Sequence, residues 1–256
     1  MTKVILSGSA SHMGKEVISF CENSCDIQIV AGISRNPDSS LPFPVYSDIN
    51  EFNGEADVIV DFSHPLKLEM ILSFAESRRI PLVLCTTGYS KADEEKIAAT
   101  AEKVAVLKSS NMSLGVNLML KLCKNAASVL GADYDIEIVE KHHRRKIDSP
   151  SGTAIMLADK IAESLSDEAV YVYDRHSKRA ARGKNEIGIQ SLRGGNIVGE
   201  HSVIFCGDEE ILELKHSALS RRVFARGAIE AAKFISSATK PGLYNMDDLI
   251  SNKIGL

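Results

Sequence analysis

The sequence contains no long apolar run, no excess of positive charge and no C-x-x-C pair. No apolar stretch approaches the roughly 20 residues needed to cross a bilayer, and the apolar opening from Val4 to Leu6 is too short for a secretory leader. The formal net charge of −4 excludes a general basic field that would recruit nucleic acid. The five cysteines are scattered, which favours reduced thiols in the cytoplasm over a disulfide or zinc framework. We therefore expect neither a membrane nor a nucleic-acid partner.

The first half of the chain alternates short apolar runs with helical patterns. Its 256 residues are 44% hydrophobic and 25% charged, which is typical of a globular protein with one large or two small domains. The runs are continuous, as in parallel strands covered on both faces. Strands are predicted at 4–6, 27–33, 58–60, 82–84 and 104–107, and helices at 15–23, 66–78 and 91–103. These repeated β–α–β units predict a Rossmann-like doubly wound parallel sheet, an α/β fold.

The pattern changes in the second half. A long helix over 115–130 precedes a strand over 135–140 and a helix that begins at Ser151. Three more strands are predicted at 186–192, 201–205 and 211–215, separated by glycine-rich turns. This order predicts a smaller α+β domain with a mixed or antiparallel sheet. A last helix over 223–236 could belong to either domain, because periodicity alone does not decide it.

A glycine-containing turn follows the first predicted strand. It has the sequence Gly8-Ser9-Ala10-Ser11-His12-Met13-Gly14, and a helix is expected from about Lys15. Glycines at such a turn let the backbone approach a pyrophosphate at the helix N-terminus. The usual middle glycine is replaced by Ala10-Ser11, so the motif by itself also fits an ordinary β–α turn.

The second predicted strand ends at Ser34-Arg35, about 20 residues past the turn, where an acidic residue would bind the adenosine ribose. No acid stands at these two positions, and Arg35 can pair with a 2′-phosphate. We therefore predict that NADPH is preferred over NADH and that NADH can also be accepted. The alternative is that Arg35 is a solvated surface residue.

The run from Glu137 to Ala154 contains the densest group of titratable side chains in the sequence. Six consecutive cationic or titratable residues, Lys141–Lys146, precede a predicted helix start at Ser151-Gly152-Thr153. His142 and Lys146 can supply protons, and backbone N–H groups at a helix start bind carboxylate or phosphate. A helical segment would place these two side chains on one face, whereas an extended segment would leave their meeting to the fold. The run predicts a site that holds and protonates a small dianion.

This run resembles the signature of the 4-hydroxy-tetrahydrodipicolinate reductase (dihydrodipicolinate reductase) family of the diaminopimelate–lysine pathway. Every specified position of E-x-x-E-x-H-H-x-x-K-x-D-x-P-S-G-T-A is present. Four other segments are similar to the family's pattern: 8–14, 85–88, 109–117 and 192–201. The chain departs from the family at Ser11, His12 and Cys85. The resemblance covers essentially the whole chain.

The resemblance implies a division of the chain and a set of cofactor contacts. A dinucleotide-binding domain over 1–113 would be completed by 222–256, and 114–221 would form a substrate-binding and tetramerisation domain, which implies a homotetramer. The implied cofactor contacts are Gly8, Ser9, Ala10, Ser11, His12, Met13, Ser34, Arg35, Cys85, Thr86, Thr87, Ser109, Ser110, Asn111 and Met112.

The implied reaction is the NAD(P)H-dependent reduction of a small dicarboxylate, 4-hydroxy-tetrahydrodipicolinate, to tetrahydrodipicolinate. His142 would donate the proton, with Lys146 as a second donor and electrostatic partner. His143, Ser151, Gly152 and Thr153 would bind the carboxylates. His201 and His216 are expected to be structural, and Arg193 could be structural or functional.

Three alternatives remain open on the sequence. Another two-domain NAD(P)-dependent oxidoreductase, such as an amino-acid dehydrogenase, could reuse the pocket for a different acid. A non-catalytic nucleotide-sensing protein could use the basic run for phosphates, although the net charge supplies no spare positive surface. A metal at His142-His143 is disfavoured, because adjacent histidines point poorly at one ion and the nearby carboxylates lack a ligand spacing. We expect no metal.

Overall fold

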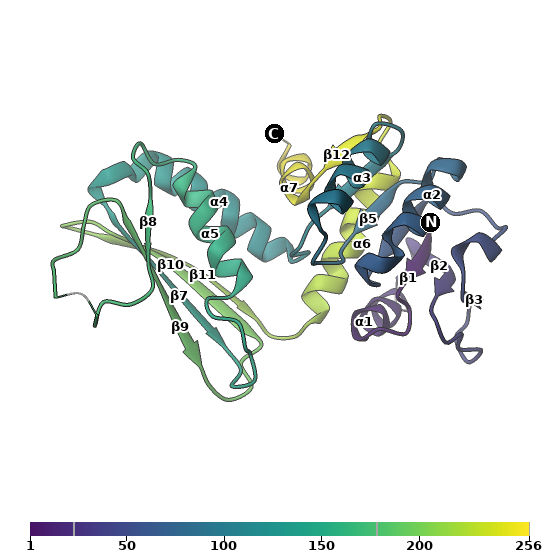
Figure 1. Cartoon of the computed structure of the whole chain (residues 1–256), viewed down its shortest axis with the longest axis horizontal. Coiled ribbons are helices and arrows are strands. Elements are labelled where there is room, and N and C mark those ends of the chain that lie inside the picture. The colour runs from purple at the N-terminus through teal and green to yellow at the C-terminus, as the bar shows by residue number, and fades with distance from the viewer. Residues whose placement is uncertain (23, 178, 256) are drawn as a thin grey trace. The chain divides into compact units, whose positions relative to one another are not determined.

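The computed structural model describes residues 1–22, 24–177 and 179–255, and these form two compact units (Figure 1). The first unit contains Met1–Leu114 together with the segment that begins at Arg221. The second unit is Gly115–Ser220. Each unit has its own sheet and its own hydrophobic core.

The first unit is built on a seven-stranded parallel sheet. The chain forms β1, moves outward to β2 and β3, and then returns to the other side of β1 with β4. The carboxyl ends of β1 and β4 therefore flank the point where the strand order reverses, which is where such sheets bind ligands. In spatial order the strands are β12 (Gly242–Tyr244), β6 (Ala105–Lys108), β5 (Leu82–Leu84), β4 (Val58–Asp61), β1 (Thr2–Ser7), β2 (Ile27–Ile33) and β3 (Val45–Tyr46).

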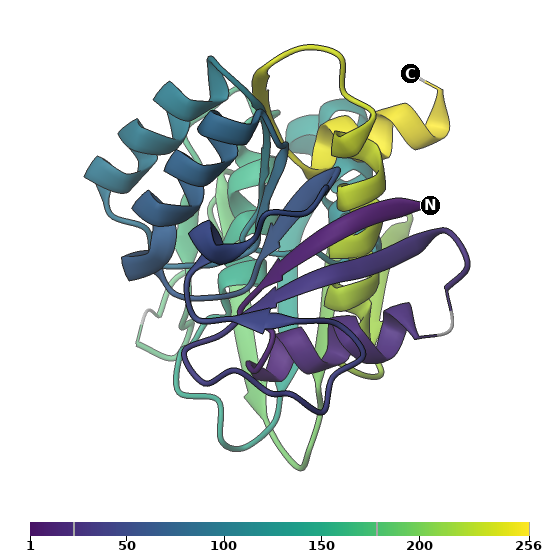
Figure 2. The same ribbon diagram turned by 90° about the vertical axis from the view of Figure 1, so that its right-hand side faces the viewer.

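Helices cover both faces of this sheet (Figure 2). Val4 and Leu6 pack in one apolar cluster with α1 (His12–Cys21), α6 (Arg222–Ser236) and α7 (Met246–Ile254). Ile5 and Ile59 pack in the other with α2 (Leu68–Arg78) and α3 (Lys91–Ala101). Both faces of the strands are buried, which explains the continuous apolar runs. The predicted doubly wound parallel sheet is confirmed.

The structure departs from the prediction at the first helix, which begins at His12 and not near Lys15. Ser11 is its N-cap, and the Ser11 hydroxyl accepts a hydrogen bond from the Gly14 N–H at 2.9 Å. The serine that interrupts the glycine motif thus satisfies one of the unpaired donors of the first helical turn. Four short elements were not predicted: β3, β8 (Val170–Val172), β12 and α7. The three strands among them have only two or three residues and therefore show no periodicity.

The second unit contains a five-stranded mixed sheet, as predicted. Strand β10 is antiparallel to both of its neighbours, whereas β9 is parallel to β7 and to β8. Helices α4 (Leu114–Leu130) and α5 (Gly152–Ala162) pack on one face around Ile138, Ile189 and Phe205. The spatial order is β11 (Ile211–Ala218), β10 (Gly199–Cys206), β7 (Asp135–His142), β9 (Glu186–Arg193) and β8.

Candidate active site

The glycine turn of the first unit has the geometry of a phosphate-binding loop. Gly8 has φ of +80°, and a Cβ there would lie 2.5 Å from the carbonyl oxygen of Phe62. A Cβ on Gly14 would lie 2.2 Å from the carbonyl oxygen of Gly8. Both positions therefore require glycine, one for the turn and one for close packing of α1 on the turn. The turn leads directly into the N-terminus of α1, whose partial positive charge favours an anion.

A cavity of about 630 Å³ opens beside this turn, at the carboxyl ends of β1, β4 and β5. Among its lining residues are Ser11, His12, Met13, Cys85, Thr86 and Thr87. Buried Asp61 at the end of β4 accepts a hydrogen bond from the Thr86 hydroxyl at 2.8 Å. Burial, and then the charge of Asp61, raise the pKa of the Cys85 thiol well above its usual value, so the thiol stays protonated. The structure brings together the turn and the predicted Cys85-Thr86-Thr87 segment.

The segment Ser109–Met112 lies elsewhere, at the carboxyl end of β6. The Asn111 side chain accepts a hydrogen bond from the Ser113 N–H at 2.9 Å, which holds the turn after the strand. Helix α6 packs closely against the same segment. A Cβ on Gly227 would lie 1.6 Å from the carbonyl oxygen of Met112, so only glycine fits there. These predicted contacts do not line the cavity described above.

A second, smaller cavity of about 140 Å³ lies on the other side of the turn. It is lined by the predicted Ser9, Ala10 and Ser34, and also by three polar residues that sequence reasoning missed: Lys15, Asn36 and Asp38. Predicted Arg35 is exposed and is not among the lining residues. An acidic residue, Asp38, therefore lines the same cavity as Ser34, four positions further along the chain. It lies in a loop whose path the sequence does not reveal.

The carboxylate of Asp38 is ionised at neutral pH. Hydrogen bonds from the Ser40 side chain at 2.6 Å and the Ser40 N–H at 2.9 Å lower its pKa, and the charge of Lys15 acts in the same direction.

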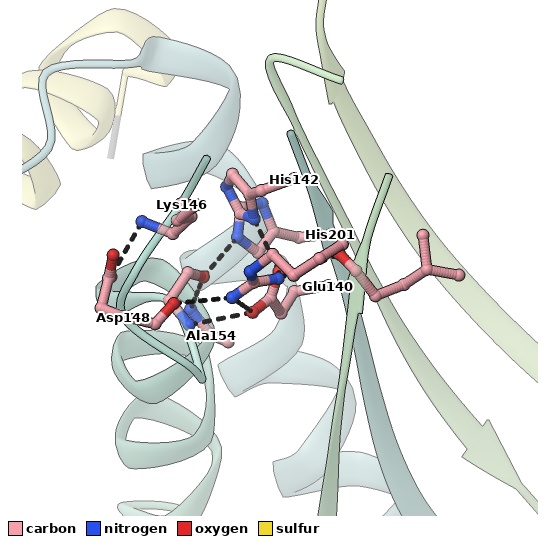
Figure 3. Close-up of polar contacts among 9 residues, drawn as sticks. Glu140, His142, Lys146, Asp148, Ala154 and His201 are labelled. Carbon is pink, nitrogen blue, oxygen red and sulfur yellow. Dashed lines mark hydrogen bonds and ion pairs between the residues drawn. The ribbon is translucent and has the colours of Figure 1, made fainter. Parts of the chain in front are cut away.

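The second unit holds a buried cluster of charged and titratable groups around Glu140 (Figure 3). Glu140 is fully buried on β7, and Arg193 on β9 donates to its two oxygens at 2.7 Å each. The Ser151 N–H adds a third bond at 3.1 Å. Burial works to raise the pKa of Glu140, but the bonds from Arg193, His142 and Ser191 outweigh it and lower the pKa to about 2. Glu140 is therefore a carboxylate at every physiological pH.

His142 ends strand β7 with its ring against Glu140. Its Nδ1 lies 2.6 Å from a Glu140 oxygen, and the side chain is buried. Its Nε2 faces Gly199 on β10, where an added Cβ would lie 3.0 Å from the nitrogen. Burial lowers the pKa of His142, and Glu140 offsets part of this effect. The imidazole therefore has one nitrogen held by a carboxylate and the other in a space that the glycine keeps free.

His201 lies next to His142, with the ring centroids 5.2 Å apart and the planes at 70°. Its Nε2 is 2.9 Å from the hydroxyl of Ser151, which also accepts from the Ala154 N–H as the N-cap of α5. Burial, then the charge of His142, lower the pKa of His201 to about 4. His201 is therefore neutral at physiological pH. The sequence interpretation treated it only as structural.

The basic segment is extended through His142 and turns only afterwards, so His142 and Lys146 do not share a helical face. The Lys146 N–H bonds to the carbonyl of His143 at 3.0 Å, and its ammonium pairs with Asp148 at 2.8 Å. The charge of Lys146 still contributes to lowering the pKa of His142, so the two side chains belong to one electrostatic site. Arg144 and Arg145 are exposed.

The predicted carboxylate-binding residues differ in what is already bonded to them. Both the N–H and the hydroxyl of Ser151 are engaged by Glu140, Ala154 and His201. Gly152, the first residue of α5, is exposed, and Thr153 is half-buried. The Nδ1 of His143 is buried and has no hydrogen-bond partner among the residues that the structure describes. Cations, an imidazole and a helix N-terminus thus lie on one short segment, an arrangement suited to a dianion.

Two negative findings concern the described part of the chain. Within residues 1–22, 24–177 and 179–255, no three His, Cys, Asp or Glu side chains are grouped as metal ligands would be. None of the helices described there has the length and apolar character required to span a bilayer.

A doubly wound unit with a glycine turn, joined to a mixed-sheet unit with a buried Arg–Glu–His cluster, defines the class of two-domain nicotinamide-dinucleotide oxidoreductases. Two family models match this chain. The dihydrodipicolinate reductase N-terminus model matches residues 2–112, and the dihydrodipicolinate reductase C-terminus model matches residues 115–250. The chain belongs to the 4-hydroxy-tetrahydrodipicolinate reductase family. It is an oxidoreductase that reduces 4-hydroxy-tetrahydrodipicolinate in lysine biosynthesis, as the sequence predicted.

Relatives support this assignment over the full length. The 4-hydroxy-tetrahydrodipicolinate reductase of Clostridium novyi (strain NT) is 47% identical to this chain, over 99% of this chain and 100% of the relative. The enzyme of the same name from Clostridium tetani (strain Massachusetts / E88) is 45% identical, over 98% of each chain. Among solved structures, the dipicolinate-bound dihydrodipicolinate reductase from Paenisporosarcina sp. TG-14 has a TM-score of 0.82 at 24% identity, over 97% of this chain and 99% of that one. The fold is also that of the C. glutamicum DAP dehydrogenase, with a TM-score of 0.57 at 15% identity, over 98% of this chain and 95% of that one.

Proposed function

We propose that His142 is the proton donor of this reduction, that the second unit binds the dicarboxylate substrate, and that the first unit binds NADPH in preference to NADH. The observation that carries the proposal is the ring of His142, held through Nδ1 by buried Glu140, on the same segment as Lys146 and the start of α5. Bound in the first unit, the dinucleotide supplies the hydride. The remaining steps fall to side chains of this chain.

The residues of the first unit fit a dinucleotide. Gly8 and Gly14 let the chain turn tightly into α1, whose N-terminus suits a pyrophosphate. Cys85-Thr86-Thr87 line the larger cavity, and Ser109–Met112 follow the next strand of the sheet with hydroxyl and amide groups that suit a carboxamide. Hydroxyl and amide donors at strand ends are what orientation of a nicotinamide requires.

The preference for NADPH rests on cations near Ser34. Arg35 is exposed and follows Ser34 directly, and Lys15 lines the smaller cavity. Either can pair with a 2′-phosphate. Asp38 in the same cavity is a carboxylate that accepts hydroxyl donors and repels a phosphate. The opposing charges support use of both dinucleotides, with NADPH favoured by the two cations.

The substrate carboxylates are bound by His143, Lys146 and the turn that starts α5. Within this turn Gly152 and Thr153 face the substrate, and Ser151, whose N–H and hydroxyl are already engaged, holds the turn in place. The partial positive charge at the N-terminus of α5 and the lysine ammonium neutralise a dianion. Negative charge that builds on the substrate during reduction is stabilised by the same cations. His142 then delivers the proton from Nε2, and Lys146 is the second donor and electrostatic partner.

A homotetramer in the cytoplasm completes the proposal. Among the described residues, α4 and α5 cover one face of the mixed sheet, which leaves the other face for a second copy of the chain (Figure 1). The five cysteines are free, which suits a reducing compartment.

The test is oxidation of NADPH and NADH with the unstable substrate generated in situ from pyruvate and aspartate semialdehyde. We expect rapid oxidation, faster with NADPH. His142→Gln should lower kcat by roughly 100-fold or more while leaving the affinity for NADPH nearly unchanged, because general acids contribute about 10²–10⁴. A variant that keeps most of its rate would remove His142 from the mechanism. Faster use of NADH would contradict the cofactor proposal alone.

A further inference from the structure

The carboxylate of Glu140 is placed to control the ring of His142. Glu140 and His142 are two residues apart on β7, so their side chains lie on the same face of the strand. The Nδ1···Oε2 distance is 2.6 Å, in the range of charge-assisted hydrogen bonds. Glu140 is fully buried, so water does not compete for this bond.

This contact determines which ring nitrogen carries the exchangeable proton. An ionised carboxylate can only accept, so the Nδ1 of His142 must donate in both the neutral and the cationic ring. The proton gained and lost by His142 is therefore the one on Nε2. That nitrogen faces Gly199, the position without a side chain on the neighbouring strand.

Arg193 provides the matching cation. In the parallel register of β7 and β9, Arg193 lies opposite His142, and its two terminal nitrogens reach both oxygens of Glu140. The same guanidinium donates to the carbonyl of Asp148 at 2.7 Å. Arg193 thereby ties the loop that carries Lys146 to the sheet.

We infer that Glu140 and Arg193 are positioning residues of the proton donor: Glu140 fixes the tautomer and orientation of His142, and Arg193 limits how strongly that carboxylate retains the imidazolium. A buried carboxylate without a counter-cation would hold the proton tightly and make the ring a poor donor. With the cation in place, the carboxylate holds that proton less strongly, since Arg193 acts to lower the pKa of His142. This inference rests on the proposed role of His142 as the acid.

Other charged and titratable groups surround His142 and Glu140. His201 approaches from β10, and His216 lies opposite His201 on β11. Lys146 and its partner Asp148 approach from the loop. Helix α5 contributes the Ser151 N–H to Glu140. Of these, Arg193 and Lys146 lower the pKa of His142, whereas Glu140 raises it.

The first experiment measures the wild-type protein. Nitrogen-15 NMR of the imidazoles in the wild-type protein, with His142→Gln used to assign the signal, reports which nitrogen of neutral His142 carries hydrogen. We expect the Nδ1–H form. An Nε2–H form would overturn the inference whatever the kinetics show.

The second experiment is Glu140→Gln, with Glu137→Gln as the matched control. The side-chain N–H₂ of glutamine must point either at Arg193 or at the imidazole. In the first case the paired hydrogen bonds from Arg193 are lost, and in the second the Nδ1–H form of His142 is no longer favoured. We expect kcat to fall roughly 10–100-fold, part of what a general acid contributes, with the KM for NADPH unchanged. Because Glu140 raises the pKa of His142, the loss of activity with rising pH should begin at lower pH.

Glu137 lies on the same strand and accepts from Arg175 at 2.6 Å and from Arg182 at 3.4 Å. Among the described residues, its ion pairs are with arginine side chains and not with the His142 cluster. Its glutamine variant should keep the wild-type kcat and pH profile. A folded Glu140→Gln protein with the wild-type kcat and pH profile would overturn the inference. If His142→Gln were still inactive in that case, the proposed role of His142 as the proton donor would stand.

If Glu140→Gln does not fold, Arg193→Lys takes its place. It retains the charge and loses the two-pronged geometry, so kcat should fall several-fold with little movement of the pH profile. Wild-type kcat in that variant would overturn the part assigned to Arg193.

Discussion

The hydroxyl of Ser151 lies 2.9 Å from Nε2 of His201, and it simultaneously caps helix α5. One serine therefore joins the start of the helix to a buried imidazole, while its backbone N–H bonds to Glu140. Removing the hydroxyl should disturb both a helix end and a side chain of the candidate site.

Ser151→Ala should lower the free energy of unfolding by about 1–2 kcal/mol through loss of the cap, and by about 1–3 kcal/mol more because His201 loses its partner. Urea unfolding at pH 7 measures this. Ser90→Ala is the control, since Ser90 caps α3 at an exposed site. The control should show only the first loss and wild-type kcat. Equal losses in the two variants would mean that the bond to His201 contributes nothing.

The free energy of unfolding should decrease as pH falls, in two windows that meet near pH 4. The pKa of His201 is lowered from 6.5 to about 4, so the unfolded chain binds more protons between these values and the native state is destabilised as pH falls through them. At about 1.4 kcal/mol per pKa unit, the loss reaches about 3 kcal/mol by pH 4. His142 and His216 act in the same direction.

The second window belongs to Glu140, whose pKa is lowered from 4.5 to about 2. Its stabilising contribution is complete above pH 4.5 and is lost as pH falls from there towards 2. Urea midpoints at several pH values should show His201→Gln flattening the upper window and leaving the lower one. A His201→Gln protein with the wild-type slope between pH 6.5 and 4 would contradict the assignment.

Gly199→Ala should reduce catalysis more than stability. The new methyl would lie 3.0 Å from Nε2 of His142, so the ring must shift by a few tenths of an ångström. Because a displacement of 1 Å can cost about 100-fold, we expect a several-fold fall in kcat with an unchanged KM for NADPH. Gly195→Ala lies in the loop that joins β9 to β10, has nothing within 4 Å of its Cβ, and tests for general effects of changing this loop. It should leave kcat intact although its positive φ costs stability.

Arg35→Ala should lower kcat/KM for NADPH roughly tenfold and leave NADH nearly unaffected, as expected for one lost charged contact to a phosphate. Asp38→Asn should act in the opposite direction and favour NADPH, because it removes a carboxylate from the smaller cavity. Initial rates with both dinucleotides test the pair. If Arg35→Ala were neutral while Lys15→Ala lost NADPH, the 2′-phosphate contact would lie on α1.

The fold was predictable to the extent that packing leaves a repeating pattern. Buried strands such as 27–33 and 82–84 were located to the residue, because both faces are covered and every position is apolar. The start of α1 was misplaced because Ser11 was considered only as a lost glycine, although serine is also an N-cap residue. Short strands that are only partly buried, such as β3, lack the continuous apolar run that revealed 82–84.

At the candidate site, the signal for Glu140 was present but was not used. Extending the predicted strand by two residues places Glu140 and His142 on one face. No such signal existed for Arg193 or His201. They lie 53 and 61 positions beyond Glu140, and strand pairing alone brings them to it.

The sequence by itself determined the class of fold, the family and the segment that holds the titratable residues, because apolar periodicity and a long local signature are both written along the chain. Only the tertiary structure decided that Glu140 is the partner of His142, that Arg193 neutralises it and that Ser151 joins it to His201. Hydrogen bonds and charges act over a few ångströms in space, and the register of β7 with β9 and β10 is set by the packing of the whole sheet.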